Sequence, residues 1–448
     1  MSHSQLRLYS TSFHTSNRLA AVPLPALDDQ AGTNNEIFID PDKSFQEIEG
    51  FGGAFTESAA VTFAEMPETL QKEVLSAYFD PEKGHGYTLC RTHLNSCDFS
   101  LGNYACADKP DDTDLTSFTL DRERKALLPL MQSAQKTAGG KIQMLISPWS
   151  PPAWMKTTGI MNQGGKLRPE CAAIWAKHYL RFAEELAREG LPVWGLTVQN
   201  EPAATQSWDS CIYTAEEEGA FVRDHLGPLL HKAGRQDIRI LVWDHNREII
   251  YSRVKPIYDD PETSKYVWGA GFHWYCGDHF DNVQLVHESY PDKKLLFTEG
   301  CQESGVHGGS WALGERYARS IINDLNQWTV GWIDWNILLN EAGGPNHVGN
   351  YCSAPIIYDR VMKRLNWQSS YYYIGHFSRF IKPGARRIVA ASSKDELETT
   401  AAVNPDGSIA VVVLNRTEQA FPFHFRIGNQ DTMVESPARS LITLVVPK

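Results

Sequence analysis

Residues 193–202 read VWGLTVQNEP, a short apolar run that ends in two amides, a glutamate and a proline. Apolar runs of this kind, separated by longer amphipathic stretches, are typical of βα units around a parallel sheet. The sequence contains eight of them: 48–53, 87–91, 142–147, 193–199, 238–243, 267–273, 294–298 and 330–335. Their starts lie 27 to 55 residues apart, which leaves room for a helix and a loop each time. Eight such units predict an α/β fold, a closed (β/α)8 or TIM barrel.

The segment between the third and fourth runs has the helical periodicity that this fold requires. Ile174, His178, Phe182 and Leu186 recur every four residues, so they share one face of a helix. A basic last turn and a glycine follow at 188–190, and both are common where a helix ends.

The pattern changes to strand-like alternation near residue 371, as in FPFHFR at 421–426. The expected strands are 388–392, 399–403, 409–415, 421–427 and 441–446, with 7–12 and 36–39 near the N-terminus as partners. Because the C-terminal strands are too few to close a core alone, we expect a discontinuous all-β sandwich domain. It would combine an N-terminal segment (1–45) with a C-terminal segment (371–448), on either side of a catalytic barrel at 46–370.

Composition excludes several classes of protein. The chain has 448 residues, 42% hydrophobic and 21% charged, which is the profile of a folded globular protein. Its net charge of −12 repels nucleic-acid backbones, so we expect no nucleic-acid partner. No apolar run reaches the ~20 residues that span a bilayer, so we expect no integral membrane segment. The sequence does not specify an oligomeric state.

The compartment is predicted from the cysteines and the N-terminal residues. The eight cysteines are scattered and include no CxxC, and the first twenty residues lack the basic and apolar regions of a signal peptide. These features favour a cytoplasmic protein. A secreted protein whose leader had been removed would look the same.

Two glutamates directly follow inner strands of the predicted barrel, Glu201 after the fourth and Glu299 after the seventh. In a (β/α)8 barrel the working side chains come from the C-terminal ends of the strands. Two carboxyl groups facing each other there suit glycoside cleavage, one to protonate the departing oxygen and one to attack or stabilise the anomeric carbon. Either glutamate alone could be an ordinary loop carboxylate, but their shared position favours a catalytic pair.

Aromatic side chains are expected at the same end of the barrel, where they would suit the apolar C–H faces of sugar rings. They are Trp149, Trp208, Trp335 and the run His273-Trp274-Tyr275. The alternative is that they fill the core, as most of the 13 tryptophans must. Asp98 either accepts hydrogen bonds from sugar hydroxyls or caps a following helix. We expect Arg91 to orient a catalytic carboxylate rather than to contact the sugar.

Motifs for other chemistries are absent from the sequence. It has no HExxH or His-x-His, no GxSxG elbow, no Walker loop and no GxGxxG. We therefore expect neither a metal nor a cofactor.

An ordered set of motifs runs along the chain from about Gln46 to the C-terminus: GFGGAFTE (50–57), SCDFS (96–100), SPWSPPAW (147–154), NEP (200–202), HWY (273–275), FTE (297–299), GWIDWN (331–336) and GHFSRFI (375–381). This set resembles glycoside hydrolase family 30, and within it the glucosylceramidase branch. The resemblance implies a retaining double displacement with Glu201 as acid/base and Glu299 as nucleophile. The loop after Glu201 reads AATQSWD and is shorter than in that branch, which puts ceramide as the aglycone in question.

The resemblance also implies roles for the surrounding residues. Asp98, Trp149, Asn200, Trp335 and Asn350 would line the subsite for the non-reducing sugar, with Asn200 beside the 2-hydroxyl. His273 and Tyr275 would support the glutamates, and Arg91 would lie below the nucleophile. We therefore expect an exo-acting β-glucosidase whose partner is a β-linked glucoside or gluco-oligosaccharide. The alternatives are an endo-β-1,6-glucanase of the same family and a carbohydrate-binding barrel without turnover.

Overall fold

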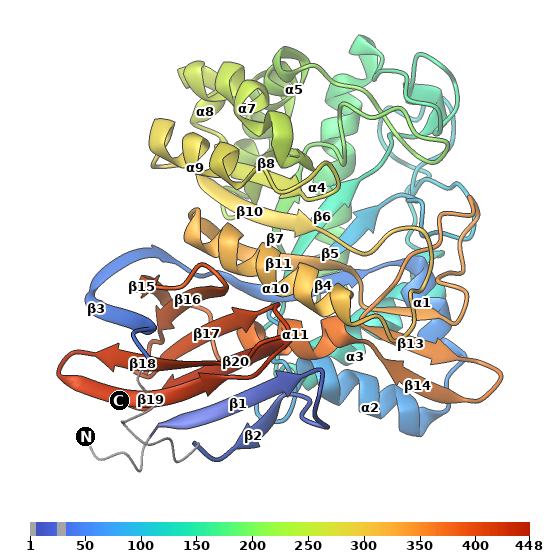
Figure 1. Cartoon of the computed structure of the whole chain (residues 1–448). Helices are drawn as coiled ribbons and strands as arrows, with labels where there is room; N and C mark the ends of the chain where they lie inside the picture. Colours follow the sequence, from blue (N-terminus) through green and yellow to red (C-terminus); the bar gives the residue numbers. More distant parts are fainter. Residues whose placement is uncertain (1–5, 25–32) are drawn as a thin grey trace.

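The computed structural model describes residues 6–24 and 33–448, and its centre is the predicted closed barrel of eight parallel strands (Figure 1). In chain order the barrel strands are β4 (Gly50–Phe55), β5 (Leu89–Leu94), β6 (Gln143–Pro148), β7 (Val193–Thr197), β8 (Arg239–Asn246), β9 (Val267–His273), β10 (Lys294–Glu299) and β11 (Thr329–Asn336). Each strand end lies within three residues of the expected one. The apolar runs therefore located the inner sheet correctly.

Helices cover the outside of the barrel. They are α1 (Glu57–Ala64), α2 (Glu68–Phe79), α3 (Leu127–Thr137), α4 (Ala172–Arg188), α5 (Ala215–Phe221), α6 (Gly227–Lys232), α7 (Ile250–Asp259), α8 (Pro261–Ser264), α9 (Phe280–Ser289), α10 (Trp311–Asn326) and α11 (Ser369–Ser378). The longest, α4, is the helix predicted from its four-residue repeat. It ends at Arg188, and Gly190 follows with a positive φ of 80° that a glycine adopts without strain.

The inward-facing side chains of the barrel change from apolar to polar along the strands. Near the N-terminal ends, one apolar cluster combines Leu89, Leu145, Leu296 and Ile333 with residues of β7 and β8. In three of these strands the residue two positions after the leucine is polar and buried. These residues are Arg91, Ser147 and Thr298. Because side chains two apart in a strand share a face, one end of the barrel is filled with hydrocarbon and the other presents polar groups.

The second domain is a nine-stranded sheet built from both ends of the chain. Its strand order is β19-β18-β3-β15-β16-β17-β20-β1-β2. The strands are β1 (Arg7–Ser12), β2 (Ala20–Val22), β3 (Glu36–Glu47), β15 (Arg386–Ser392), β16 (Leu397–Val403), β17 (Ile409–Asn415), β18 (Phe421–Ile427), β19 (Gln430–Ser436) and β20 (Ser440–Val446). One apolar core takes side chains from strands at both ends of the sheet, including Leu8 and Phe423, so the sheet folds over on itself. This is the discontinuous β-domain expected from the sequence (Figure 1, blue and red strands).

A third, small sheet was not predicted. It contains β12 (Leu338–Asn340), β13 (Ile356–Asp359) and β14 (Arg364–Trp367), and β12 continues directly from the last barrel strand. It therefore borders the C-terminal end of the barrel. No helix in the described ranges is both long and apolar enough to span a bilayer.

Candidate active site

Arg91 lies at the centre of the polar end of the barrel and is fully buried. Its guanidinium donates to the Glu299 carboxylate (3.1 Å), the Asp244 carboxylate (2.7 Å) and the Asn200 side-chain oxygen (3.0 Å). It also donates to the Ser147 hydroxyl and the Thr298 carbonyl oxygen. The planar fork of arginine can serve several acceptors at once, so one side chain fixes groups from four strands or strand ends. Arg91 thus holds the Glu299 carboxylate at the centre of the site.

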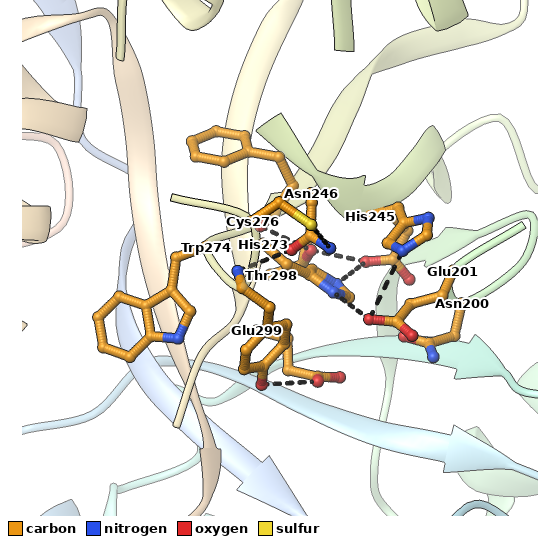
Figure 2. Close-up of polar contacts among 12 residues, drawn as sticks. Asn200, Glu201, His245, Asn246, His273, Trp274, Cys276, Thr298 and Glu299 are labelled. Atoms are coloured by element: carbon orange, nitrogen blue, oxygen red, sulfur yellow. Dashed lines mark hydrogen bonds and ion pairs between the residues drawn. The ribbon is translucent and has the colours of Figure 1, made fainter. Parts of the chain in front are cut away.

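The two candidate catalytic glutamates have different partners. Glu299 is the last residue of β10, and its carboxylate accepts from Arg91 and from the Tyr275 hydroxyl (3.0 Å). Glu201 follows β7, and its two oxygens face the ring nitrogen Nδ1 of His273 (3.3 Å) and the side-chain amide of Gln206 (3.2 Å). One oxygen of each glutamate and one nitrogen of His273 lie within 4.8 Å of one another (Figure 2).

Asp244 is a buried carboxylate of this site that the sequence analysis did not select. Trp243 and Asp244 have positive φ values of 72° and 48°, and the pairing of β8 with β9 shifts register at this point. Such a bulge bends a strand and redirects its side chains. The carboxylate of Asp244 consequently accepts four hydrogen bonds inside the barrel, from Arg91, Thr197 (2.7 Å), Thr298 (2.6 Å) and the His273 ring (3.1 Å).

The charges around His273 and Glu201 make them an ion pair. Burial disfavours a charged imidazole, but the negative charges of Glu299, Asp244 and Glu201 outweigh it and raise the pKa of His273 to about 9. Burial likewise opposes ionisation of Glu201, yet the hydrogen bond from His273 and nearby positive charge lower the pKa of Glu201 to about 2. The protonated ring donates through Nδ1 to Glu201 and through Nε2 to Asp244.

The pKa values of Glu299 and Asp244 are shifted in opposite directions by their surroundings. Burial, with a contribution from the negative charge of Glu201, raises the pKa of Glu299, although His273 and Arg91 act against the shift. For Asp244 the charge of Arg91 and the hydrogen bond from His273 overcome burial and hold the pKa below its usual range. Asp244 is therefore a buried anion at neutral pH, whereas Glu299 is the more basic of the two carboxylates.

A cavity of about 320 Å³ opens above the two glutamates. Of the predicted site residues it is lined by Asp98, Trp149, Asn200, Glu201, Trp208, Tyr275, Glu299, Trp335 and Asn350. All nine come from strand ends or from the loops that follow them, at the C-terminal rim of the barrel. His273 is not among the lining residues. Its ring is fully buried behind the pair, with both nitrogens engaged by Glu201 and Asp244.

The indole rings of Trp149 and Trp335 stack on one side of the cavity, with centroids 5.1 Å apart and an angle of 21°. The Arg91 guanidinium lies 4.9 Å from the Trp149 ring. Both tryptophans are almost fully buried, so they combine the two alternatives considered from sequence: each contributes to the core and also borders the cavity.

Asp98 contacts the cavity rather than capping a helix. A turn follows it in the chain, and its Oδ2 accepts from the Asn350 amide at 2.8 Å. Its Oδ1 is buried and has no partner in the part of the chain that the structure describes. Burial and the negative charge of Glu299 raise the pKa of Asp98 well above its usual range. An unpaired buried acceptor at a cavity wall is suited to a hydroxyl of a bound ligand.

The cavity also contains residues that the sequence analysis did not select. They are Gln206, His245, Asn246, Cys301, Glu303 and Cys352. His245 and Asn246 end β8, so the strand-end rule could have found them together with Asp244. Gln206 and Glu303 lie several residues into their loops, where no strand-based rule reaches.

Comparison with known protein families identifies both domains. The model for the glycosyl hydrolase family 30 TIM-barrel domain matches residues 48–381, and that for the family 30 beta sandwich domain matches residues 384–444. The chain belongs to glycoside hydrolase family 30. It is therefore an O-glycosyl hydrolase, and the family resemblance drawn from the ordered motifs is confirmed.

Individual relatives of this family 30 enzyme differ in their named activities. The lysosomal acid glucosylceramidase of Mus musculus is 36% identical over 412 residues, which cover 88% of this chain and 79% of the relative. The crystal structure of SrfJ from Salmonella typhimurium is 39% identical with a TM-score of 0.94, covering 99% of this chain and 100% of the other. The endo-beta1,6-glucanase BT3312 is 26% identical with a TM-score of 0.89, covering 99% of both chains.

Proposed function

We propose that this enzyme is a retaining, exo-acting β-glucosidase with Glu299 as nucleophile and Glu201 as acid/base. The observation that carries the proposal is the approach of the two carboxylates to within 4.8 Å at their nearest oxygens. Retaining enzymes hold the two carboxyl groups about 5–5.5 Å apart, whereas inverting enzymes leave about 6.5–9.5 Å for a water molecule. The short approach supports direct attack by one carboxylate on the anomeric carbon.

The partners of the two glutamates support the division of roles. Arg91 and Tyr275 donate to Glu299, which orients its carboxylate and leaves it ionised for attack. Its raised pKa makes it a more basic and therefore stronger nucleophile. Within the described ranges no arginine pairs with Glu201, and its side chain is held instead by His273 and Gln206.

The acid step requires a proton on Glu201, and His273 can supply it. The ring carries a proton on Nδ1 at neutral pH, 3.3 Å from the Glu201 carboxylate. As the glycosidic bond breaks and the departing oxygen becomes basic, the proton passes along this contact through the Glu201 carboxylate to that oxygen, which leaves a neutral imidazole. Asp244 fixes the ring by accepting from Nε2. In the second step Glu201, as carboxylate, takes a proton from the attacking water and returns the pair to its starting state.

The wall around Asp98 supports exo action on a glucoside. Asp98 and Asn350 are hydrogen-bonded to each other at one wall of the cavity, and the free oxygen of Asp98 can accept from a ring hydroxyl. The stacked pair Trp149 and Trp335 borders the same region. A terminal sugar with equatorial hydroxyls fits this combination of acceptors and aromatic faces. Relatives named glucosylceramidases support glucose as that sugar.

A panel of 4-nitrophenyl β-glycosides (gluco, xylo, fuco and galacto), followed by proton NMR, tests this function. We expect the glucoside to be the best substrate and β-glucose to be the first product. Release of α-glucose would contradict the retaining mechanism. Because a similar structure is that of an endo-β-1,6-glucanase, the β-1,6-glucan pustulan should be assayed as a second substrate. Early appearance of oligosaccharides from pustulan would replace exo with endo action.

Replacement of the acid/base provides a sharper test. Glu201→Gln should lower the hydrolysis of glucosides with poor leaving groups by about 10²–10⁴ fold. The 2,4-dinitrophenyl glucoside needs no proton on its leaving group, so added azide should restore its turnover and yield glucosyl azide. Unchanged hydrolysis of poor substrates by the variant would contradict the role of Glu201.

A further inference from the structure

Several residues that line the cavity lie on the side of the acid/base Glu201. Gln206 and His245 both face Glu201: the Gln206 amide donates at 3.2 Å, and the His245 ring nitrogen Nε2 is 3.9 Å from the carboxylate. An acid/base stands beside the oxygen that departs, so the residues around it border the leaving group. Trp208 and Glu303 line the same cavity from neighbouring loops.

The chemistry of the cavity wall is that of a sugar site. Gln206, His245 and Glu303 offer an amide, an imidazole and a carboxylate, and Trp208 offers a half-buried indole. Among the described residues that line the cavity there is no Ala, Val, Leu, Ile, Met or Phe. Long acyl chains require contact with aliphatic surface to leave water. Hydroxylated rings instead use polar groups together with an aromatic face.

The loop that carries Gln206 and Trp208 is held in place. The Gln206 carbonyl accepts from the Gln163 backbone at 2.9 Å, and the Ser207 carbonyl accepts from the Asn162 side chain at 2.9 Å. Glu303 is fixed by an ion pair with Arg316 at 2.8 Å. Groups that are already ordered lose little conformational freedom when a ligand binds. The wall is therefore preorganised for one shape of leaving group.

We infer that Gln206, Trp208, His245 and Glu303 form a subsite for a second sugar ring, so that the preferred substrates are β-linked gluco-oligosaccharides rather than glucolipids. This inference rests on the proposed β-glucosidase function and specifies its aglycone. Trp208 supplies the platform for the second ring, and the polar groups accept and donate hydrogen bonds to its hydroxyls.

The test compares leaving groups that are all alcohols and need the same proton from the acid. We would measure kcat/KM for β-1,3-, β-1,4- and β-1,6-linked glucose disaccharides and for octyl β-D-glucoside. We expect the best disaccharide to exceed the octyl glucoside by at least about tenfold. Trp208→Ala should lower that ratio by about tenfold, the effect of losing one aromatic platform.

A control tryptophan separates this effect from a general loss of stability. Trp268 is also half-buried, but it packs on Trp194 at the opposite end of the barrel. Trp268→Ala should leave the disaccharide-to-octyl ratio unchanged, even if the variant is less stable.

Three results separate this inference from the proposed function. The sugar subsite would be contradicted if octyl glucoside, or glucosylceramide in detergent micelles, were cleaved as efficiently as the best disaccharide. A ratio unaffected by Trp208→Ala would do the same. Failure to cleave 4-nitrophenyl β-glucoside at all would instead contradict the β-glucosidase function.

Discussion

Replacing Asp244 by asparagine tests whether His273 holds the proton used by Glu201. Asn keeps the shape of the side chain but removes the negative charge that lies 3.1 Å from the His273 ring. A unit charge about 4 Å away contributes about 4 kcal/mol at an effective dielectric constant of 20. Since one pKa unit corresponds to about 1.36 kcal/mol, the loss can lower the pKa of His273 by up to about three units. The side-chain oxygen of the substituted asparagine can still accept from Nε2, so the expected shift is about one or two units.

The assay is the pH dependence of kcat/KM for an alkyl β-glucoside, whose leaving group needs a proton. In the unmodified enzyme the alkaline limb should lie near the His273 pKa of about 9, because activity is lost as the ring is deprotonated. In Asp244→Asn the limb should move to about 7–8. If the alkaline limb stayed at its original pH in a folded variant, His273 would not be the source of the proton used by Glu201.

A matched control accounts for the stability cost of the substitution. Loss of one partner from a buried ion pair costs about 3–5 kcal/mol, and Asp244 is the buried partner of Arg91. Asp324 is an equally buried carboxylate, paired with Arg247 at 2.9 Å away from the cavity. Asp324→Asn should destabilise the protein comparably and leave the alkaline limb in place. Denaturant unfolding at pH 6 and pH 8 defines the conditions under which both variants are folded.

Further predictions concern stability and the nucleophile. The raised pKa of His273 stabilises the fold fully below about pH 6.5, and this contribution should be lost as pH rises through about 9, which urea titrations across that range would detect. Tyr275→Phe removes one of the two hydrogen bonds that orient the Glu299 carboxylate for attack, so kcat for an aryl glucoside should fall about 10–100 fold with little change in Tm. Trp335→Ala leaves a cavity beside Trp149 and should lower the free energy of unfolding by about 3–5 kcal/mol in the same titrations.

The sequence was sufficient to predict the barrel because its inner strands are continuous apolar runs. Each of the eight was located within three residues, and the glutamates at 201 and 299 followed from the strand ends alone. The discontinuous β-domain was predicted by the same means, because alternation marks strands with one buried face. The strand Gln430–Ser436 was missed because QDTMVES contains too few apolar residues to alternate clearly.

The features that were missed depend on backbone geometry rather than on residue pattern. Asp244 enters the barrel only because Trp243 and Asp244 adopt positive φ values in a bulge, which breaks the alternation of inward and outward side chains. The aromatic run alone suggested that His273 faces the sugar, whereas the family resemblance implied that it supports the glutamates. In the structure its ring lies behind the glutamates and contacts Glu201 and Asp244. Hydrogen-bond partners of this kind become visible only when the strands are brought together.

The central claim is that Glu299 attacks the anomeric carbon while Glu201 faces it across the same cavity. Incubation with a 2-deoxy-2-fluoro-β-glucoside bearing an activated leaving group slows hydrolysis of the covalent intermediate and allows it to be isolated. Peptide mapping by mass spectrometry should then locate a single fluoroglucosyl ester on Glu299. A stable ester on Glu201 or on any other residue, or complete inactivation of a Glu299→Gln variant by the same reagent, would contradict the account.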